Sequence, residues 1–209
     1  SPWMQKLPGG LIHVNVVGCA LFSAISGSSA ATVATVGKMS IPELRKRNYP
    51  EKILLGSLAG SGTLGLLIPP SIILIIYGVA VQESIAKLFI AGIIPGIMIA
   101  LIFMTYVIIW SLINKKDMPK ILEEYSFLEK VKRSKQLLPV IILISAVIGS
   151  IYTGIATATE AASLGVVGAL ILSFFQKSLN LDTFKSSLLG ATKTSCMIAF
   201  ILAGSTFLS

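Results

Sequence analysis

The sequence contains few charged side chains and few of the groups that enzymes use for acid–base or metal chemistry. Only 12% of its 209 residues are charged, against about 25% in ordinary soluble domains. It has one histidine, His13, and two cysteines, Cys19 and Cys196, which both fall in apolar segments without a Cys-x-x-Cys or Cys/His pattern. We expect His13 to be a satisfied interior residue rather than a catalytic one. Without a nucleophile–base pair or a Walker-type phosphate loop, the sequence does not indicate an enzyme.

Apolar residues, by contrast, are abundant. They make up 54% of the chain, and the mean hydropathy is +0.86. Several apolar runs approach or exceed the roughly 18 to 20 residues that cross a bilayer. The composition therefore predicts an all-α polytopic membrane protein embedded in a lipid bilayer, and a soluble helical core fits less well. The formal charge of +8 does not indicate nucleic acid, because the basic residues lie between apolar runs, where they set membrane orientation.

The first apolar block, 9–36, is interrupted by the sequence SGSS at 26–29. Each arm has about 14 to 17 residues, which is short for a full crossing. Basic residues flank both ends of the block, and basic loops stay on the cytoplasmic side. The pattern predicts a re-entrant helical hairpin with its tip at 26–29.

The next apolar block, 53–80, contains several glycines and the pair Pro69-Pro70. Because proline lacks an N–H, two carbonyls one turn earlier, near Gly65 and Leu66, are predicted to lose their helical donors. Irregular backbone at membrane depth persists only where it is buried in protein or lines a polar cavity. We therefore predict a broken helix with free carbonyls, followed after Pro70 by a new helix whose N-terminus favours a carboxylate.

The remaining chain is predicted to continue as helices. Residues 81–113 contain a long membrane helix, and the charged segment 114–136 reads as an amphipathic helix along the cytoplasmic face, with a solvated linker as the alternative. Further membrane helices are expected at 137–156, 158–176 and 186–208. We interpret Glu160 as part of a helix cap with Thr157 or Thr159, in preference to a proton relay.

Serine hydroxyls and free carbonyls are hard oxygen ligands, which suit Na⁺ without any carboxylate. The serines of 26–29 and the carbonyls of 62–71 therefore predict a sodium site. Taken singly, the proline pair fits a mere kink and SGSS fits a mere loop turn. If the two breaks lay more than about 10 Å apart, no site could form, because the ligands must share one coordination sphere.

Four stretches occur in the order expected for a known family: SGSSAATVATVG, GTLGLLIPPSIILIIYG, KLFIAGIIPG and TATEAASLGVVGAL. They resemble the large membrane subunit of tripartite ATP-independent periplasmic (TRAP) transporters, over essentially the whole chain. The SGSS form is closer to the C4-dicarboxylate branch than to the sialic-acid branch. The resemblance implies a partial elevator-type fold of the ion-transporter superfamily, with 1–80 as the first transport-domain repeat, 114–136 as the arm and 137–209 as the start of the second repeat.

The resemblance also implies a function in the bacterial inner membrane. Such permeases couple inward Na⁺ flux to the uptake of organic acids, with a periplasmic binding protein that delivers substrate and a small membrane subunit that braces the large one. The implied sodium ligands are Ser26, Ser29, Gly65, Ile68 and Pro70, and Ser28 and Ser71 are candidates for contacting the substrate. A second hairpin, broken helix and sodium site would follow residue 209, so we expect a fragment. A membrane scaffold or assembly subunit without an ion site, and a channel, are the competing hypotheses.

Overall fold

The computed structural model describes residue 4 and residues 7–119 and 138–208, and within them the regular structure is helical, with no strand. The chain divides into two compact units, residues 1–138 and 139–209. The helices of the first unit are η1 (Gly10–Ile12), α1 (His13–Ser26), α2 (Ser29–Lys46), α3 (Glu51–Gly62), η2 (Thr63–Leu66), α4 (Ile72–Ala80), α5 (Ile85–Ile113) and η3 (Lys115–Asp117). Those of the second unit are α7 (Leu138–Tyr152), α8 (Ala158–Phe175) and α9 (Leu181–Leu208).

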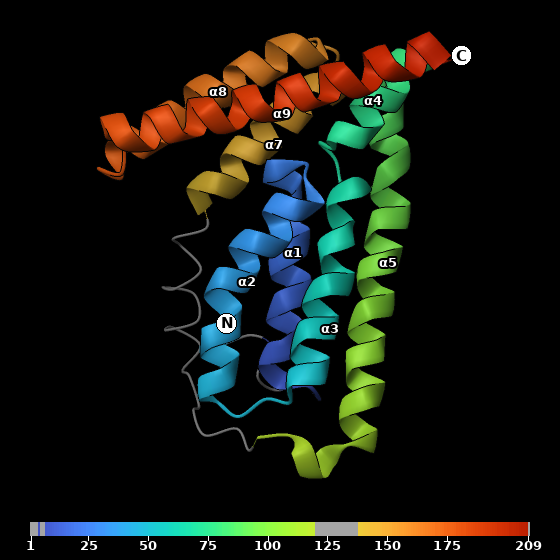
Figure 1. Ribbon diagram of the computed structural model, residues 1–209, viewed down its shortest axis with the longest axis vertical. Helices are drawn as coiled ribbons and strands as arrows, with labels where there is room; N and C mark the ends of the chain where they lie inside the picture. The colour runs from blue at the N-terminus through green and yellow to red at the C-terminus, as the bar shows by residue number, and fades with distance from the viewer. Residues whose placement is uncertain (1–3, 5–6, 120–137, 209) are drawn as a thin grey trace. The chain divides into compact units, whose positions relative to one another are not determined.

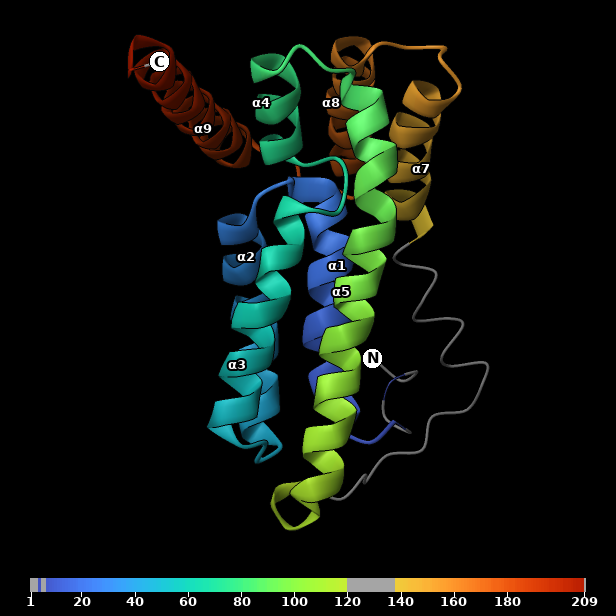
Figure 2. The ribbon, with the colours of Figure 1, turned by 90° about the vertical axis from the view of Figure 1, so that its right-hand side faces the viewer.

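In the first unit, α1, α2 and α3 pack against one another, and α5 runs alongside α1 and α3 (Figures 1 and 2). The contacts are made by apolar residues at helical spacing, which is how an amphipathic face buries itself. Three buried clusters result: Leu11, Leu44 and Leu54; Ile12, Ile53 and Val107; and Cys19, Val36 and Leu58. These clusters fix α1 between its neighbours and so set the position of the α1–α2 turn.

The α1–α2 hairpin turns through only two residues. Gly27 adopts a left-handed conformation with φ of 58°, and its N–H donates to the carbonyl of Ser23. Ser28 is extended and N-caps α2 with its hydroxyl. The predicted tip at 26–29 is thus narrower than expected, because Ser26 and Ser29 each belong to a helix.

The second arm of the hairpin is longer than predicted. Helix α2 runs to Lys46 rather than ending at 36. Val36, Ser40 and Leu44 continue one buried face at four-residue intervals, so packing carries the helix onward. The cations Arg45 and Lys46 in the last turn also complement the negative end of the helix dipole.

The predicted helix break lies between α3 and α4. Helix α3 tightens into η2, an irregular segment of residues 67–71 follows, and α4 begins at Ile72. The peptide bond between Pro69 and Pro70 is cis. Of the predicted arm at 114–136, the structure describes only a short stretch containing η3, and residues 120–136 lie outside the described part of the chain.

The second unit carries apolar helices with well-formed starts. Thr157 and Glu160 form a capping box at the start of α8, which confirms the predicted helix cap. Helix α9 begins at Leu181 rather than 186, because the Asn180 side chain accepts a hydrogen bond from the N–H of Thr183 at 2.7 Å. By length and composition, α5, α8 and residues 181–204 of α9 are long and apolar enough to cross a membrane.

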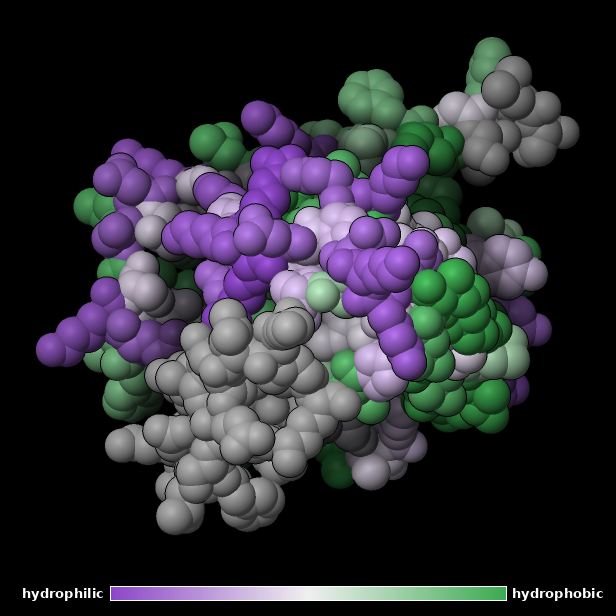
Figure 3. Space-filling view, turned by 90° about the horizontal axis from the view of Figure 1, so that it is seen from below, coloured by the Kyte–Doolittle hydropathy of each residue, from purple (hydrophilic) through white to green (hydrophobic). Residues whose placement is uncertain are grey.

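Hydrophilic side chains gather at the end of the first unit where α2 ends and α3 begins (Figure 3). Here Arg45 pairs with Glu51 at 2.6 Å, and Arg47 pairs with Glu43 at 2.8 Å. The Arg45 guanidinium lowers the pKa of the exposed Glu51 carboxyl through their hydrogen bond. Exposed ion pairs of this kind contribute little to stability, so we regard this end as a solvated face.

Candidate functional site

The hairpin tip lies directly against the broken helix. The amide of Ile72 donates a hydrogen bond to the carbonyl of Gly27 at 3.2 Å. A Cβ atom placed on Gly65 would stand 2.9 Å from the backbone nitrogen of Ser29. Two segments are therefore in backbone contact through residues that are 36 and 45 positions apart in sequence. This is well inside the roughly 10 Å limit that a shared coordination sphere requires.

Two glycines permit this contact. Gly27 combines its left-handed φ with a tight position, since a Cβ there would meet the Pro70 carbonyl oxygen at 2.8 Å. Gly65 is restricted by space alone, because the backbone of Ser28 and Ser29 occupies the place of a side chain. Only glycine allows backbone to approach backbone this closely.

The three serines of the tip have different surroundings. The Ser26 hydroxyl hydrogen-bonds the Thr32 hydroxyl at 2.9 Å and lies 3.3 Å from both the backbone N–H and the carbonyl of Ser28. The Ser28 hydroxyl accepts from the N–H of Ala31 at 3.5 Å. The Ser29 Oγ is buried and has no hydrogen-bond partner. A buried hydroxyl without a partner is costly and calls for an explanation, such as a water molecule, an ion or local strain.

The carbonyls of the break are only partly as predicted. The N–H of Ile68 donates to the carbonyl of Leu64 at 2.9 Å. The next carbonyl, that of Gly65, would accept from residue 69 in a helix, but Pro69 has no N–H, so this carbonyl lacks a helical donor. The Leu66 carbonyl, predicted to be free, instead accepts from the Ser71 hydroxyl at 2.8 Å. That prediction was wrong because a side chain five residues ahead replaces the donor that proline removes.

One amide at the start of α4 is also occupied. The N–H of Ile72 would serve the Ile68 carbonyl in a continuous helix, but here it bonds Gly27, so this amide is not open to a carboxylate. Ser71, predicted to contact substrate, is fully buried. Its hydroxyl instead bonds the Leu66 carbonyl within the break. The Pro70 carbonyl faces Gly27.

Of the five predicted sodium ligands, Ser29 and Gly65 thus lie in direct contact. Ser26 lies at the same hairpin tip, and the Pro70 carbonyl faces that tip at Gly27.

Sequence reasoning overlooked Thr32. It is fully buried, and its hydroxyl fixes that of Ser26 across the hairpin turn. Thr32 is four residues after Ser28 and three after Ser29, which places it on the face of α2 that starts at the tip. This helical spacing was the feature of the sequence from which Thr32 could have been predicted to lie near the tip serines.

A buried polar contact joins α1 to α3 further from the tip. The Asn15 amide nitrogen donates to the Leu54 carbonyl at 3.2 Å and to the Ser57 hydroxyl at 3.0 Å. At the start of α1, His13 Nε2 lies 2.8 Å from the Pro8 carbonyl and must be its donor, because a carbonyl can only accept. His13 is fully buried, as predicted, but it is satisfied only at Nε2, because its buried Nδ1 has no hydrogen-bond partner.

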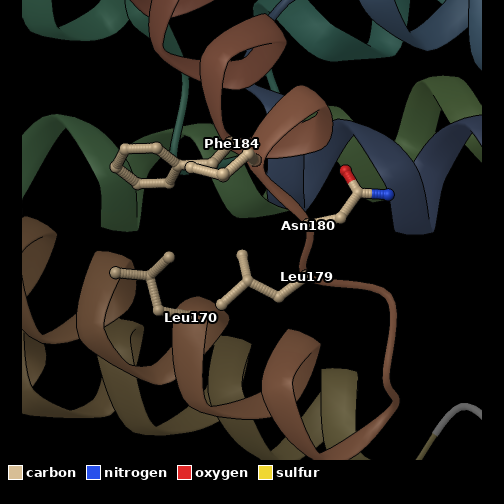
Figure 4. A pocket seen from close by; sticks show the side chains of 5 residues that line it. Leu170, Leu179, Asn180 and Phe184 are labelled. Atoms are coloured by element: carbon tan, nitrogen blue, oxygen red, sulfur yellow. The ribbon is translucent and has the colours of Figure 1, made fainter.

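The second unit holds an apolar pocket of about 550 Å³ between α8 and the start of α9. Leu170, Leu179 and Phe184 face one another across it, and the Asn180 amide points away (Figure 4). Its lining residues include no titratable group. Within the described residues there is also no cluster of three or more His, Cys, Asp or Glu side chains that could hold a metal ion. The contact between the tip and the break is therefore the strongest candidate site.

Comparison with known proteins gives a consistent family. Residues 4–209 match the family model for the tripartite ATP-independent periplasmic transporter, DctM component. The chain is 38% identical over 197 residues to the C4-dicarboxylate TRAP transporter large permease protein DctM of Pseudomonas aeruginosa, covering 93% of this chain and 45% of that protein. It is 37% identical to the ectoine/5-hydroxyectoine large permease UehC of Ruegeria pomeroyi, covering 97% and 46%.

A third relative, the sialic acid TRAP transporter permease protein SiaT of Haemophilus influenzae, is 36% identical, with coverage of 95% of this chain and 32% of that protein. The chain therefore spans between a third and a half of the length of these relatives. The three relatives carry three different substrate names at nearly equal identity.

Proposed function

We propose, from the premise that this chain belongs to the DctM component family of tripartite ATP-independent periplasmic transporters, that it is part of a Na⁺-coupled permease for organic acids. Na⁺ is the coupling ion and part of the cargo. The contact between the α1–α2 tip and the α3–α4 break is its candidate site. The substrate class is a carboxylate such as a C4-dicarboxylate, and the chain is not itself an enzyme.

The single observation that carries the ion site is the buried Ser29 hydroxyl without a partner, next to Gly65. Hydroxyl and carbonyl oxygens at unwound helices are the ligands that transporters use for Na⁺. The Gly65 carbonyl has no helical donor, and Ile68 has lost the amide of Ile72 to Gly27. The ligand set is therefore Ser29, Gly65 and Ile68, with Ser26 and Pro70 at its edge.

The hydrogen bond from Ile72 to Gly27 also supports an elevator-type movement. It joins the hairpin to the broken helix, so the two would move across the membrane together and an ion site between them would keep its ligands. In this proposal α1 to α4 move together with α5, which packs against α1, α3 and α4. The hairpin is re-entrant, with its basic ends on the cytoplasmic side of the bacterial inner membrane. A small membrane subunit and a periplasmic binding protein complete the transporter.

The test is uptake by the complete permease, reconstituted in liposomes with its small membrane subunit and supplied with its binding protein loaded with a radiolabelled C4-dicarboxylate. Uptake is measured against external Na⁺ concentration, with choline as the replacement cation. We expect Ser29→Ala to raise the Na⁺ concentration for half-maximal uptake by about tenfold, the equivalent of about 1.4 kcal/mol of binding free energy.

The matched control is Ser23→Ala. The Ser23 Oγ is also buried and without a partner, but it lies within α1 rather than at a break, so its removal should leave the Na⁺ dependence unchanged. Uptake that is independent of Na⁺ in the unmodified protein would reject the coupling. Equal Na⁺ dependence in both variants would reject the site and favour a scaffold subunit without an ion site.

A further inference from the structure

The irregular backbone of the break packs against two glycines of α5. A Cβ atom on Gly92 would stand 2.7 Å from the carbonyl oxygen of Leu67. A Cβ atom on Gly96, one turn later, would stand 3.0 Å from Cγ1 of Ile68. Both glycines are buried. Residues 67 and 68 therefore pack against α5 at two positions where a side chain other than hydrogen would collide with them.

The same stretch of backbone also contacts the hairpin tip. Gly65 lies against the Ser29 backbone, and two residues later the Leu67 carbonyl lies against Gly92. The irregular segment of residues 67–71 has fewer backbone hydrogen bonds than a helix, because Pro69 and Pro70 have no N–H to donate. Its position therefore depends on the Ser71–Leu66 hydrogen bond and on its packing against α5.

We propose that Gly92 and Gly96 are positioning residues for the Na⁺ site: they seat the unwound backbone of residues 67 and 68 so that the neighbouring Gly65 and Ile68 carbonyls are held toward Ser29. This inference rests on the proposed function. It assigns α5 a part in cation binding although α5 supplies none of the proposed ligands. A cation between Ser29 and this backbone would supply the partner that the buried Ser29 hydroxyl lacks.

The size of the effect follows from the distances. Ordinary van der Waals contact begins near 3.4 Å, so a methyl group on Gly92 has to move the Leu67 carbonyl by about 0.7 Å, the difference between 3.4 and 2.7 Å. Ligand constellations tolerate errors of only about 0.5 Å. On Gly96 the methyl group meets the side chain of Ile68, which yields more easily than backbone.

The experiment compares three glycine-to-alanine variants in the complete, reconstituted permease described above. We expect Gly92→Ala to raise the Na⁺ concentration for half-maximal uptake by about tenfold, and Gly96→Ala by about threefold. Gly56→Ala in α3, where no atom lies within 4 Å of the added Cβ, should have no effect. The KM for the loaded binding protein at saturating Na⁺ should be unchanged in all three, which a general packing defect would not predict.

A graded series at Gly96 keeps the test decisive if Gly92→Ala does not accumulate in the membrane. Gly96→Val places more atoms against Ile68 than Gly96→Ala does, so it should raise the Na⁺ concentration for half-maximal uptake further. Wild-type Na⁺ dependence in both Gly92→Ala and Gly96→Ala, or no further change in Gly96→Val, would overturn the inference. Absence of Na⁺ dependence in the unmodified protein would instead refute the proposed function.

Discussion

The carbonyl oxygen of Gly27 accepts a hydrogen bond of 3.2 Å from the amide of Ile72. Gly27 is the turning point of the α1–α2 hairpin, and Ile72 is the first residue of α4. This one bond satisfies a carbonyl at the end of one helix with a donor at the start of another, both of which would otherwise be unpaired. It ties the two helix breaks into a single structural element.

Gly27→Ala should weaken this element. The substitution forces an alanine into the left-handed region, at about 1 kcal/mol, and brings its Cβ to 2.8 Å from the Pro70 carbonyl. We expect an overall loss of at least about 2 kcal/mol in the free energy of unfolding, measured by thermal unfolding in detergent. Gly154→Ala is the control, since Gly154 has φ of 71° and no atom within 4 Å of an added Cβ. Equal losses in the two variants would show that the contact with Pro70 contributes nothing.

Ser71→Ala should destabilise the break itself. Ser71 is fully buried, and its hydroxyl is the donor for the Leu66 carbonyl. Removing it leaves that carbonyl without its donor, which costs about 1 to 2 kcal/mol. Ser178→Ala is matched in geometry, because Ser178 also donates to a carbonyl five residues earlier, at 3.2 Å, but is exposed. Thermal unfolding should be unaffected in that control; a shift as large as that of Ser71→Ala would contradict the assigned role.

Asn15 and Ser57 should be energetically coupled. Their side chains share a buried hydrogen bond of 3.0 Å between α1 and α3. A double-mutant cycle with Asn15→Leu and Ser57→Ala should give a coupling free energy of about 0.6 to 1.7 kcal/mol, the range for polar contacts between membrane helices. Thr105→Ala, whose hydroxyl bonds only the Leu101 carbonyl of its own helix, should combine additively with Asn15→Leu. Additive behaviour of Asn15 and Ser57 would mean that their hydrogen bond does not join the helices.

Thr157→Ala should destabilise the start of α8 by about 1 kcal/mol. The Thr157 hydroxyl accepts from the Glu160 N–H, and the Glu160 carboxylate accepts from the Thr157 N–H at 2.8 Å. Ser84→Ala at the start of α5 should cost less, since its capping bond is 3.5 Å long. Thermal unfolding measures both.

Glu160→Gln should leave uptake and its pH dependence unchanged, because we assign Glu160 to a helix cap and not to proton transfer. Glutamine keeps an acceptor oxygen for the Thr157 N–H, so the cap is retained. The measurement is uptake by the reconstituted permease between about pH 5 and pH 8, because a carboxyl that relays protons would impose a pH-dependent step on uptake. Loss of a pH-dependent step in this variant would revive the relay hypothesis.

The helix breaks were predictable from sequence because their causes are local. Pro69 and Pro70 lack N–H groups wherever they lie, and glycine between serines ends a helix by its own conformational preference. The cap at Thr157 was predictable for the same reason, since its partner is three residues away. The extension of α2 to Lys46 and the start of α9 at Leu181 were missed, because buried packing in one case and a capping asparagine in the other outweighed the hydropathy pattern.

The sequence by itself determined the class of the protein, the positions of its helix breaks and the oxygen-rich character of the residues around them. Only the tertiary structure decided that Gly27 bonds Ile72, that Ser71 takes up the Leu66 carbonyl, and that Gly92 and Gly96 lie against the unwound backbone. The physical reason is that a missing donor is a property of one residue, whereas the group that replaces it is chosen by the packing of helices distant in sequence.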